Sequence, residues 1–417
     1  MEKKSDSVVV VGAGIIGLCT AYSLLKAGRA VTIIDREGDS QTSCSYGNAG
    51  MVVPSHFIPL AAPGIIAKGL RWLANPEGPF YIRPRMSMDL VRWCRLFSQH
   101  ATAKHVDASC ELIRDLNLES RRLFTELAKD LEVELVEKGL LMLCNSEKTL
   151  QEEAEVAEMA KRLGVGAEVC DAARLKELDK GIQMDVKGGV WFKDDCHMDP
   201  ATMVTSLRAK VKAMGAEFMI GAEVSGLSKG SNGMVKLEGV DLPDDQEIVL
   251  ACGVWSGELM KTMGHRMPMQ AGKGYSLTMK NPRELPELCS ILCEAKVAVT
   301  PMGGALRFGG TMEICGNDLS VNPRRVHGIV KSVSHYFPNF QESDFEGIEP
   351  WAGLRPCSPD GLPYIGRVAG SANLTVASGH SMMGLSMGPV TGQVVAEILT
   401  SNTPPLDIRK LDPLRFN

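Results

Sequence analysis

The chain carries a glycine-rich loop of the type that binds the phosphates of a dinucleotide. The loop, Val8-Val-Val-Val-Gly12-Ala-Gly14-Ile-Ile-Gly17, joins a β-branched run to a helical pattern, and Asp35 ends the next apolar run. Gly12 permits the tight turn, Gly14 lets the backbone approach a pyrophosphate, and Gly17 lets the helix lie close to the sheet. Asp35 can accept a hydrogen bond from a ribose hydroxyl. The loop predicts a bound dinucleotide but does not distinguish NAD from a flavin nucleotide.

A single arginine stands in an apolar segment near the end of the chain, Trp351-Ala-Gly-Leu-Arg355-Pro356. Arginine can hold a carboxylate with two hydrogen bonds, and it stays charged when it loses its hydration. Arg355 could therefore bind an acidic substrate. It could equally form a structural ion pair with a nearby acid such as Asp360. The spacing of the residues leaves both interpretations open.

Two further segments are rich in small residues. Ser43-Cys-Ser-Tyr46-Gly47-Asn48-Ala49-Gly50 follows the second apolar run, and Gly379-His380-Ser-Met-Met-Gly384 leads toward the last helix. Small residues allow backbone contact with a flat or anionic ligand, and a glycine-rich start to a helix exposes N–H donors. Both segments could instead serve only as turns or as close helix–sheet contacts. For His380, a buried, hydrogen-bonded role is commoner than that of a catalytic base.

The composition is that of a globular protein of 417 residues, with 44% hydrophobic and 23% charged residues. The net charge of −5 gives no electrostatic support to nucleic-acid binding. The twelve cysteines form no C-x-x-C pair, which predicts reduced thiols in a cytoplasmic protein without a metal site. No uncharged apolar run is long enough to span a bilayer, and no hydrolase, P-loop or metalloprotease motif occurs.

One segment is amphipathic and cationic, from Ile65 to Ala74. Residues 80–84 and 90–97 are similar in character, since each combines basic and aromatic side chains. Such short helices can seat a protein on a membrane surface. The simpler interpretation is that they lie against the core and leave Lys68 and Arg71 in solvent.

The order of helical and strand patterns predicts two domains. Nucleotide-binding α/β patterns occupy residues 1–85, 190–262 and 340–417. A helical segment at 86–189 and a series of short alternating strands at 263–339 interrupt them. We therefore expect a Rossmann-like domain made of discontinuous segments, and an inserted α+β substrate domain with a mainly antiparallel sheet. Ligand and substrate would meet at the interface of the two domains.

Motifs along nearly the whole chain resemble those of the flavin-dependent D-amino-acid dehydrogenase family. That family lies within the larger group that contains D-amino-acid oxidase, glycine oxidase and sarcosine oxidase. The matching motifs are residues 10–17, Gly47-Asn-Ala-Gly50, Pro59-Leu-Ala-Ala-Pro-Gly64, Ala251-Cys-Gly-Val-Trp-Ser256, Gly272-Lys-Gly-Tyr-Ser-Leu277, Thr300-Pro-Met-Gly-Gly304, Leu306-Arg-Phe-Gly-Gly310, Trp351 to Gly366, and Gly379-His380.

The resemblance implies an FAD cofactor bound in extended form and no metal. It also implies that Arg355 binds the substrate carboxylate, with Tyr275 or Tyr46 as hydrogen-bond partners and His56 as a further catalytic candidate. The implied cofactor contacts are Gly12, Gly14, Ile15, Ile16, Gly17, Asp35, Arg36, Ser43, Asn48, Ala49, Gly50, Val224, Gly253, Trp255, Gly379, His380 and Gly384.

The implied reaction is dehydrogenation or oxidative deamination of an amino or imino acid, by hydride transfer from Cα to flavin N5. D-amino acids are preferred, with D-proline and D-hydroxyproline among the candidates. The electrons would pass to a quinone, a respiratory carrier or oxygen, and the enzyme could contact the inner face of a membrane. Two alternatives remain: an oxygen-using enzyme similar to sarcosine or glycine oxidase, and a non-catalytic flavoprotein subunit. Met382 or a neighbour stands where glycine oxidases have a second arginine, so their substrate preference is not carried over.

Overall fold

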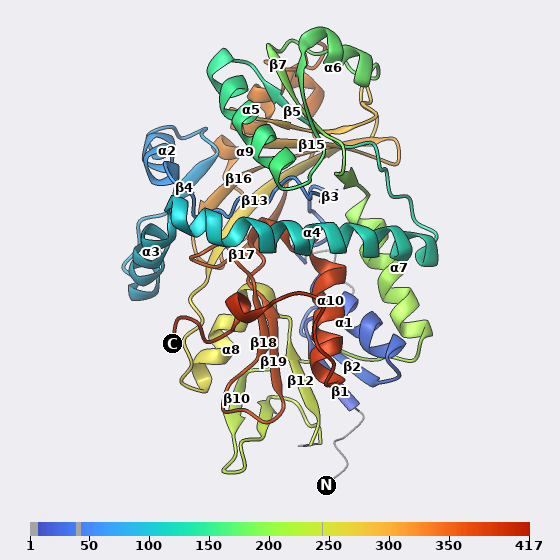
Figure 1. Ribbon diagram of the computed structural model, residues 1–417, viewed down its shortest axis with the longest axis vertical. Helices are drawn as coiled ribbons and strands as arrows, with labels where there is room; N and C mark the ends of the chain where they lie inside the picture. The colour runs from blue at the N-terminus through green and yellow to red at the C-terminus, as the bar shows by residue number, and fades with distance from the viewer. Residues whose placement is uncertain (1–6, 39–42, 244) are drawn as a thin grey trace.

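The computed structural model describes residues 7–38, 43–243 and 245–417. Two sheets dominate the fold and lie toward opposite ends of the molecule (Figure 1). The long helix α4 (Ala103–Leu131) crosses the molecule between them (Figure 1). It contacts both α7 (Pro200–Ala213) and α10 (Gly388–Leu399).

The first sheet contains the glycine-rich loop. In the part of the chain that the structure describes, its six strands run in the order β18 (Tyr364–Arg367), β19 (Leu374–Ser378), β12 (Glu247–Leu250), β1 (Ser7–Val11), β2 (Ala30–Asp35) and β9 (Glu217–Ile220). All neighbours are parallel except β18 and β19.

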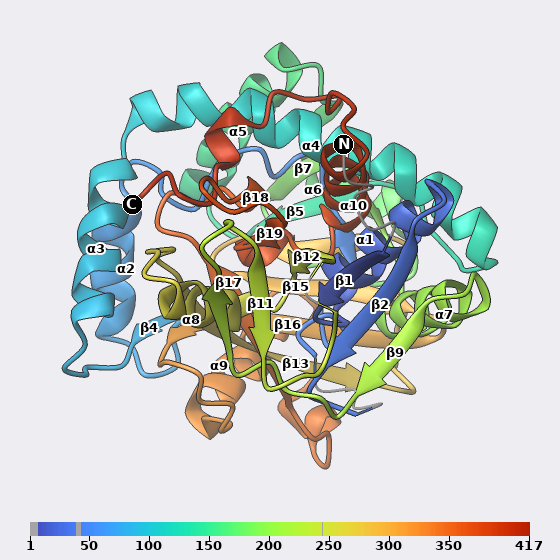
Figure 2. The ribbon, with the colours of Figure 1, turned by 90° about the horizontal axis from the view of Figure 1, so that it is seen from below.

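The valine run of β1 is continuous because both faces of this sheet are covered. Val8 and Val10 enter one core cluster together with side chains of α1 (Ile15–Lys26) and α10, while Val9 and Val11 enter another. The helices α1 and α10 contact each other, and they lie beside β1 in both views (Figures 1 and 2). The N-terminus of α1 is thereby held at the carboxyl end of β1.

The second sheet is larger and mainly antiparallel. Its strands run β17 (Trp351–Cys357), β13 (Gln270–Met279), β16 (Ala305–Ile314), β15 (Val297–Met302), β14 (Cys289–Leu292), β5 (Leu140–Cys144), β7 (Gly188–Phe192) and β6 (Ala167–Asp171), with β4 (Phe80–Ile82) beside β16. The β14–β5 and β16–β4 pairs are parallel. The mixed fold with an antiparallel second sheet is confirmed.

The remaining elements connect or cover the two sheets. They are α2 (Ile65–Leu73), α3 (Met88–His100), α5 (Glu147–Arg162), α6 (Ala172–Leu178), α8 (Ser256–Thr262), α9 (Pro323–Val333), β3 (Met51–Val52), β8 (Cys196–His197), β10 (Gly226–Lys229) and β11 (Val235–Glu238), with short 3-10 helices η1 (Gly253–Trp255), η2 (Glu342–Phe345), η3 (Ser381–Met383) and η4 (Arg409–Leu411).

The expected domain boundaries place β4 and β17 in the nucleotide-binding domain, but both strands pair in the larger sheet. Backbone hydrogen bonds to β13 and β16 decide their position, which the local pattern does not reveal. The division into two domains otherwise stays a prediction. All twelve cysteines lie within the described residues and are free thiols. No helix in the described ranges is long and apolar enough to cross a membrane.

Candidate active site

The three glycines of the phosphate loop have different structural roles. Gly12 has a φ of +111°, and a Cβ there would lie 2.5 Å from the Ala251 carbonyl oxygen. A Cβ at Gly17 would lie 1.8 Å from the Gly12 carbonyl oxygen. At Gly14 the nearest atom to such a Cβ is Ser45 Oγ, at 3.6 Å. Contacts within the protein therefore require glycine at positions 12 and 17, whereas the space beside Gly14 is available to a ligand.

The residues around this loop fit the adenine end of FAD. Asp35 ends β2, and its Oδ2 accepts a hydrogen bond from Ala13 N at 2.6 Å, which holds the carboxylate against the loop. Gly14 is the N-cap of α1 and offers no side chain, and Ile15 N donates to Ser45 Oγ at 3.1 Å. The N–H groups of Ile16 and Gly17 are left for a phosphate. Ser43 Oγ is buried and has no hydrogen-bond partner among the residues that the structure describes. A buried hydroxyl without a partner is expected where a ligand supplies one.

Other predicted cofactor residues are brought close to β2 by the fold. The Arg36 guanidinium lies 4.2 Å from the centre of the Trp255 ring and 3.5 Å from Glu223 Oε1. Val224 follows this glutamate and packs against the core cluster of β1 and β12. Gly253 starts η1, and its carbonyl accepts a hydrogen bond from Ser378 Oγ at 2.9 Å.

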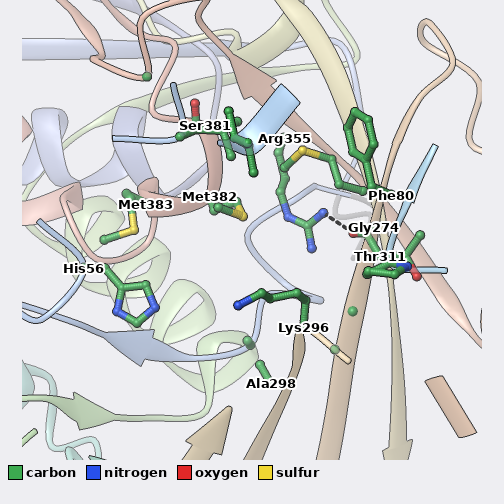
Figure 3. A pocket seen from close by; sticks show the side chains of 18 of the residues that line it. His56, Phe80, Gly274, Lys296, Ala298, Thr311, Arg355, Ser381, Met382 and Met383 are labelled. Carbon is green, nitrogen blue, oxygen red and sulfur yellow. Dashed lines mark hydrogen bonds between the residues drawn. The ribbon is translucent and has the colours of Figure 1, made fainter. Parts of the chain in front are cut away.

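A cavity of about 680 Å³ lies beside β13, β16 and β17. Its walls are mainly apolar and include side chains of α2, α3 and β4, such as Trp72, Phe80 and Trp93. Arg355 and Lys296 extend into it, with His56 beyond the end of Lys296 (Figure 3). Such a cavity suits a small ligand with an apolar part and a few charged groups.

Arg355 is half-buried on β17, and its Nη1 donates to the Thr311 carbonyl at 2.8 Å (Figure 3). A Cβ at Gly274 would lie 2.2 Å from Arg355 Nη2, so glycine at this position makes room for the guanidinium. Asp360 is held instead by Arg415, with N–O distances of 2.8 and 3.0 Å. Arg355 forms no ion pair with any acid in residues 7–38, 43–243 and 245–417, and its charge is available to a ligand.

The 47–50 segment is shaped by close contacts. A Cβ at Gly47 would lie 2.1 Å from the Trp351 ring, and one at Gly50 would lie 2.2 Å from the Met198 carbonyl oxygen. Asn48 Oδ1 accepts a hydrogen bond from Gly50 N at 2.9 Å, which is the turn role expected as an alternative. Asn48 and Ala49 also line the cavity. Turn formation and ligand contact are thus compatible here.

His56 lines the cavity, and its Nδ1 lies 3.0 Å from Ser55 Oγ. Burial lowers the pKa of His56 to about 4, and the charge of Lys296 acts in the same direction. Ser55 Oγ in turn contacts Asp195 Oδ2. Burial raises the pKa of Asp195 to about 7, against the effect of its hydrogen bonds from Ser55. Ser55 and Asp195 were not predicted from the sequence, because no local motif connects positions so far apart in the chain.

Of the two tyrosines predicted as substrate contacts, Tyr275 lines the cavity, but its hydroxyl is hydrogen-bonded within the protein. The Tyr275 hydroxyl donates to Glu313 Oε2 at 2.8 Å and accepts from Asn322 N, and the side chain lies in the core of the larger sheet. Successive side chains of a strand point to opposite faces, so Gly274 faces Arg355 and Tyr275 faces away. Tyr46 does not line the cavity, and it packs against the core of the smaller sheet. We leave both hydroxyls out of the proposed substrate site.

The 379–384 segment follows β19 and has tight local geometry. Gly379 has a φ of +78°, and a Cβ there would lie 2.5 Å from the Tyr364 ring. His380 is buried, with Nε2 2.9 Å from Thr391 Oγ1, and burial lowers its pKa to about 3. The structural role for His380 is therefore the one that its contacts support. At Gly384 a Cβ would make only an ordinary contact with His380.

Comparisons with known proteins agree with this architecture. The family model described as FAD dependent oxidoreductase (DAO) matches residues 7–398. A D-amino acid dehydrogenase of Rhizorhabdus wittichii is 32% identical over 410 residues, covering 96% of this chain and 97% of the relative. One from Vibrio atlanticus is 31% identical over 407 residues, covering 95% and 96%. The crystal structure of glycine oxidase from Geobacillus kaustophilus matches 98% of both chains with a TM-score of 0.79 and 21% identity.

The arrangement of the two sheets is thus shared with the glycine oxidase structure. The chain belongs to the DAO family of FAD-dependent oxidoreductases. It is an enzyme that uses FAD and acts on amino acids, as the resemblance in its motifs implied.

Proposed function

We propose that the enzyme dehydrogenates a D-amino or D-imino acid whose carboxylate is held by Arg355. The observation that carries the proposal is the Arg355 guanidinium, which has no acidic partner in the described part of the chain and extends into a mainly apolar cavity. A carboxylate supplies the missing charge and accepts two parallel hydrogen bonds. The D configuration is supported by the names of the two relatives.

The protein's part in the reaction is binding and orientation. The loop residues Gly12, Gly14 and Gly17, with Asp35 and Ser43, would hold FAD, which when bound supplies the acceptor for the substrate hydride. Arg355 fixes the carboxylate, and the apolar walls exclude water from the reacting carbon. Holding the substrate at one end leaves its Cα in a single orientation.

The walls of the cavity favour an apolar substrate side chain. Met382 lies in the cavity wall (Figure 3). Trp72, Phe80 and Trp93 add further apolar surface. Proline and hydroxyproline in the D form are therefore suitable candidates beside open-chain amino acids. An anaerobic screen of D- and L-amino acids for bleaching of the flavin band would identify the best substrate.

Substitution of Arg355 tests the proposed site. Arg355→Ala removes a charge-assisted, two-point contact worth about 3 kcal/mol of transition-state stabilisation. We therefore expect kcat/KM for the best amino acid to fall roughly 150-fold. Arg355→Lys should recover only part of the loss, because a lysine cannot reproduce the paired geometry. Arg83→Ala is a matched control, since Arg83 is exposed and pairs with Asp318. A value for Arg355→Ala within about threefold of the wild type would contradict the assignment.

We further infer a membrane-bound electron acceptor such as a quinone. The helix α2 lines the cavity with Gly69, Leu70 and Trp72, and Leu70 is also 65% exposed to solvent. Met88 and Val91, at the start of α3, are also exposed. Apolar side chains on short helices, with Lys68 and Arg71 nearby, favour contact with an anionic bilayer surface.

Co-sedimentation with anionic liposomes tests the membrane contact. We expect binding at low salt that weakens when Met88 and Val91 are replaced by serine, with unchanged activity toward a small dye acceptor. Substitution of Val169, an exposed apolar residue on β6, provides the control. No binding at low salt, together with stoichiometric peroxide formation in air, would favour the alternative in which oxygen is the acceptor.

A further inference from the structure

Three hydrogen-bonding side chains run from the cavity wall to a buried carboxyl group. His56 Nδ1 lies 3.0 Å from Ser55 Oγ, and Ser55 Oγ lies 2.5 Å from Asp195 Oδ2. Ser55 N also donates to Asp195 Oδ1 at 3.0 Å. Ser55 and Asp195 are buried, whereas His56 faces the cavity that contains Arg355. The chain thus connects the proposed substrate site to the interior of the protein.

A short pair of strands places these residues together. Ser55 and His56 follow β3, and Asp195 immediately precedes β8. Met51 and Val52 of β3 pair with His197 and Cys196 of β8 in antiparallel register. This pairing brings the segment after β3 against the residue before β8.

We propose that His56, Ser55 and Asp195 form a proton relay that takes up the ammonium proton of the substrate. The inference rests on the proposed function, because an amino acid carries a protonated amine at neutral pH and its nitrogen lone pair is needed when hydride leaves Cα. No hydrogen bond to His56 Nε2 occurs in the described ranges, so this nitrogen can accept from a ligand.

The transfer moves protons alone and changes no oxidation state. The substrate N–H bond breaks as a proton reaches His56 Nε2, and the Nδ1 proton passes to Ser55 Oγ. The hydroxyl proton of Ser55 passes to Asp195 Oδ2. At the end the amine is neutral, His56 and Ser55 have regained their original number of protons, and the Asp195 carboxyl is protonated.

The charges around the relay suit this direction of transfer. Burial raises the pKa of Asp195 to about 7; the neighbouring Asp194 also raises it, and Arg121 of α4 opposes the change. The nearby thiols of Cys196 and Cys289 have raised pKa values and stay protonated. Lys296 is the charged group that acts on His56, whose lowered pKa keeps the ring neutral before substrate binds. Asp195 can therefore hold a proton near neutral pH, and His56 transmits it.

Asp195→Asn is the sharpest test because it keeps the shape of the site. The amide can accept from Ser55 N and donate to Ser55 Oγ, but it cannot take up a proton. In anaerobic single-turnover reduction of the holoenzyme by the best amino acid, we expect at least a tenfold lower limiting rate at pH 7. The apparent KM should stay within threefold, and the rise of rate with pH should move up by at least one unit. Ser55→Ala should behave in the same way.

Controls separate a relay from a structural role. His327→Gln changes an exposed histidine that contacts Glu77 and Glu342, and it should leave the pH profile unchanged. Added imidazole should restore the rate of His56→Ala but not that of His56→Ala combined with Asp195→Asn. A wild-type pH profile for Asp195→Asn, or no rescue of His56→Ala, would overturn the relay.

A second measurement does not depend on turnover. Infrared titration of the substrate-free holoenzyme, compared with Asp195→Asn, should show a carboxyl group with a midpoint near pH 7 that only the wild type possesses. A midpoint below pH 5 overturns the proposal whatever the substrate is. Failure of the proposed function has a different signature, because then no amino acid reduces the flavin of the wild-type enzyme.

Discussion

Two glycine-to-alanine substitutions in the phosphate loop can separate its role in cofactor binding from its role in folding. Each substitution adds one methyl group. Gly14 has φ −73° and ψ 178°, which any residue adopts, and an added Cβ meets only Ser45 Oγ at 3.6 Å. An added Cβ at Gly17 would lie 1.8 Å from the Gly12 carbonyl oxygen, far inside contact distance. Gly14→Ala should therefore affect the ligand, and Gly17→Ala should affect the protein.

The two substitutions should change the free energy of unfolding of the apoprotein differently. Gly14→Ala should leave its free energy of unfolding unchanged or raise it by about 0.4–1 kcal/mol, because alanine restricts the unfolded chain. It should weaken FAD binding by at least tenfold, or about 1.4 kcal/mol, because the methyl group obstructs the backbone approach to the pyrophosphate. Gly17→Ala should lower the free energy of unfolding by about 1–3 kcal/mol or more, since the backbone must shift.

Urea unfolding of the two apoproteins and titration with FAD would measure both effects. Gly38→Ala is the control, because a Cβ there meets no atom of the described residues within 4 Å and lies outside the loop. Equal destabilisation by Gly14→Ala and Gly17→Ala would refute the separation of roles. An unchanged FAD affinity in Gly14→Ala would show that the pyrophosphate does not lie against this part of the loop.

Three further substitutions test the site. Tyr275→Phe should lower the free energy of unfolding by about 1–3 kcal/mol, because buried Glu313 loses a hydrogen-bond donor. Its kcat/KM should stay within threefold of the wild type. A tenfold fall in kcat/KM would show that the hydroxyl contacts the substrate. Ser381→Gly should raise the free energy of unfolding by up to about 1 kcal/mol in urea, because Ser381 has a φ of +53°. The raised pKa of Asp195 stabilises the folded state at pH values below 4, by up to about 4 kcal/mol. This stabilisation of the wild type should be lost as the pH rises from 4 to 7. Asp195→Asn should show no such loss when urea unfolding is measured at each pH.

The local sequence predicted the elements that depend on short-range chemistry. The valine run, the glycine spacing and Asp35 predicted the strand, turn and helix of the loop, which the structure places at β1, residues 12–14, α1 and β2. These features could be predicted because apolar periodicity and the conformations open to glycine act over a few residues. The resemblance of the motifs added FAD and the reaction class, which the spacing by itself left open.

Only the tertiary structure decided which side chains meet at the site. Asp360 forms an ion pair with Arg415 in the C-terminal segment and not with Arg355. The Arg355 guanidinium can therefore bind a ligand. The position of Tyr275 depends on the pleat and register of β13, and a shift of one residue would reverse its face. Ser55 and Asp195 meet because β3 pairs with β8. The sequence by itself determined the cofactor loop and the order of the elements, while contacts between distant segments determined the substrate cavity and the groups that can move its protons.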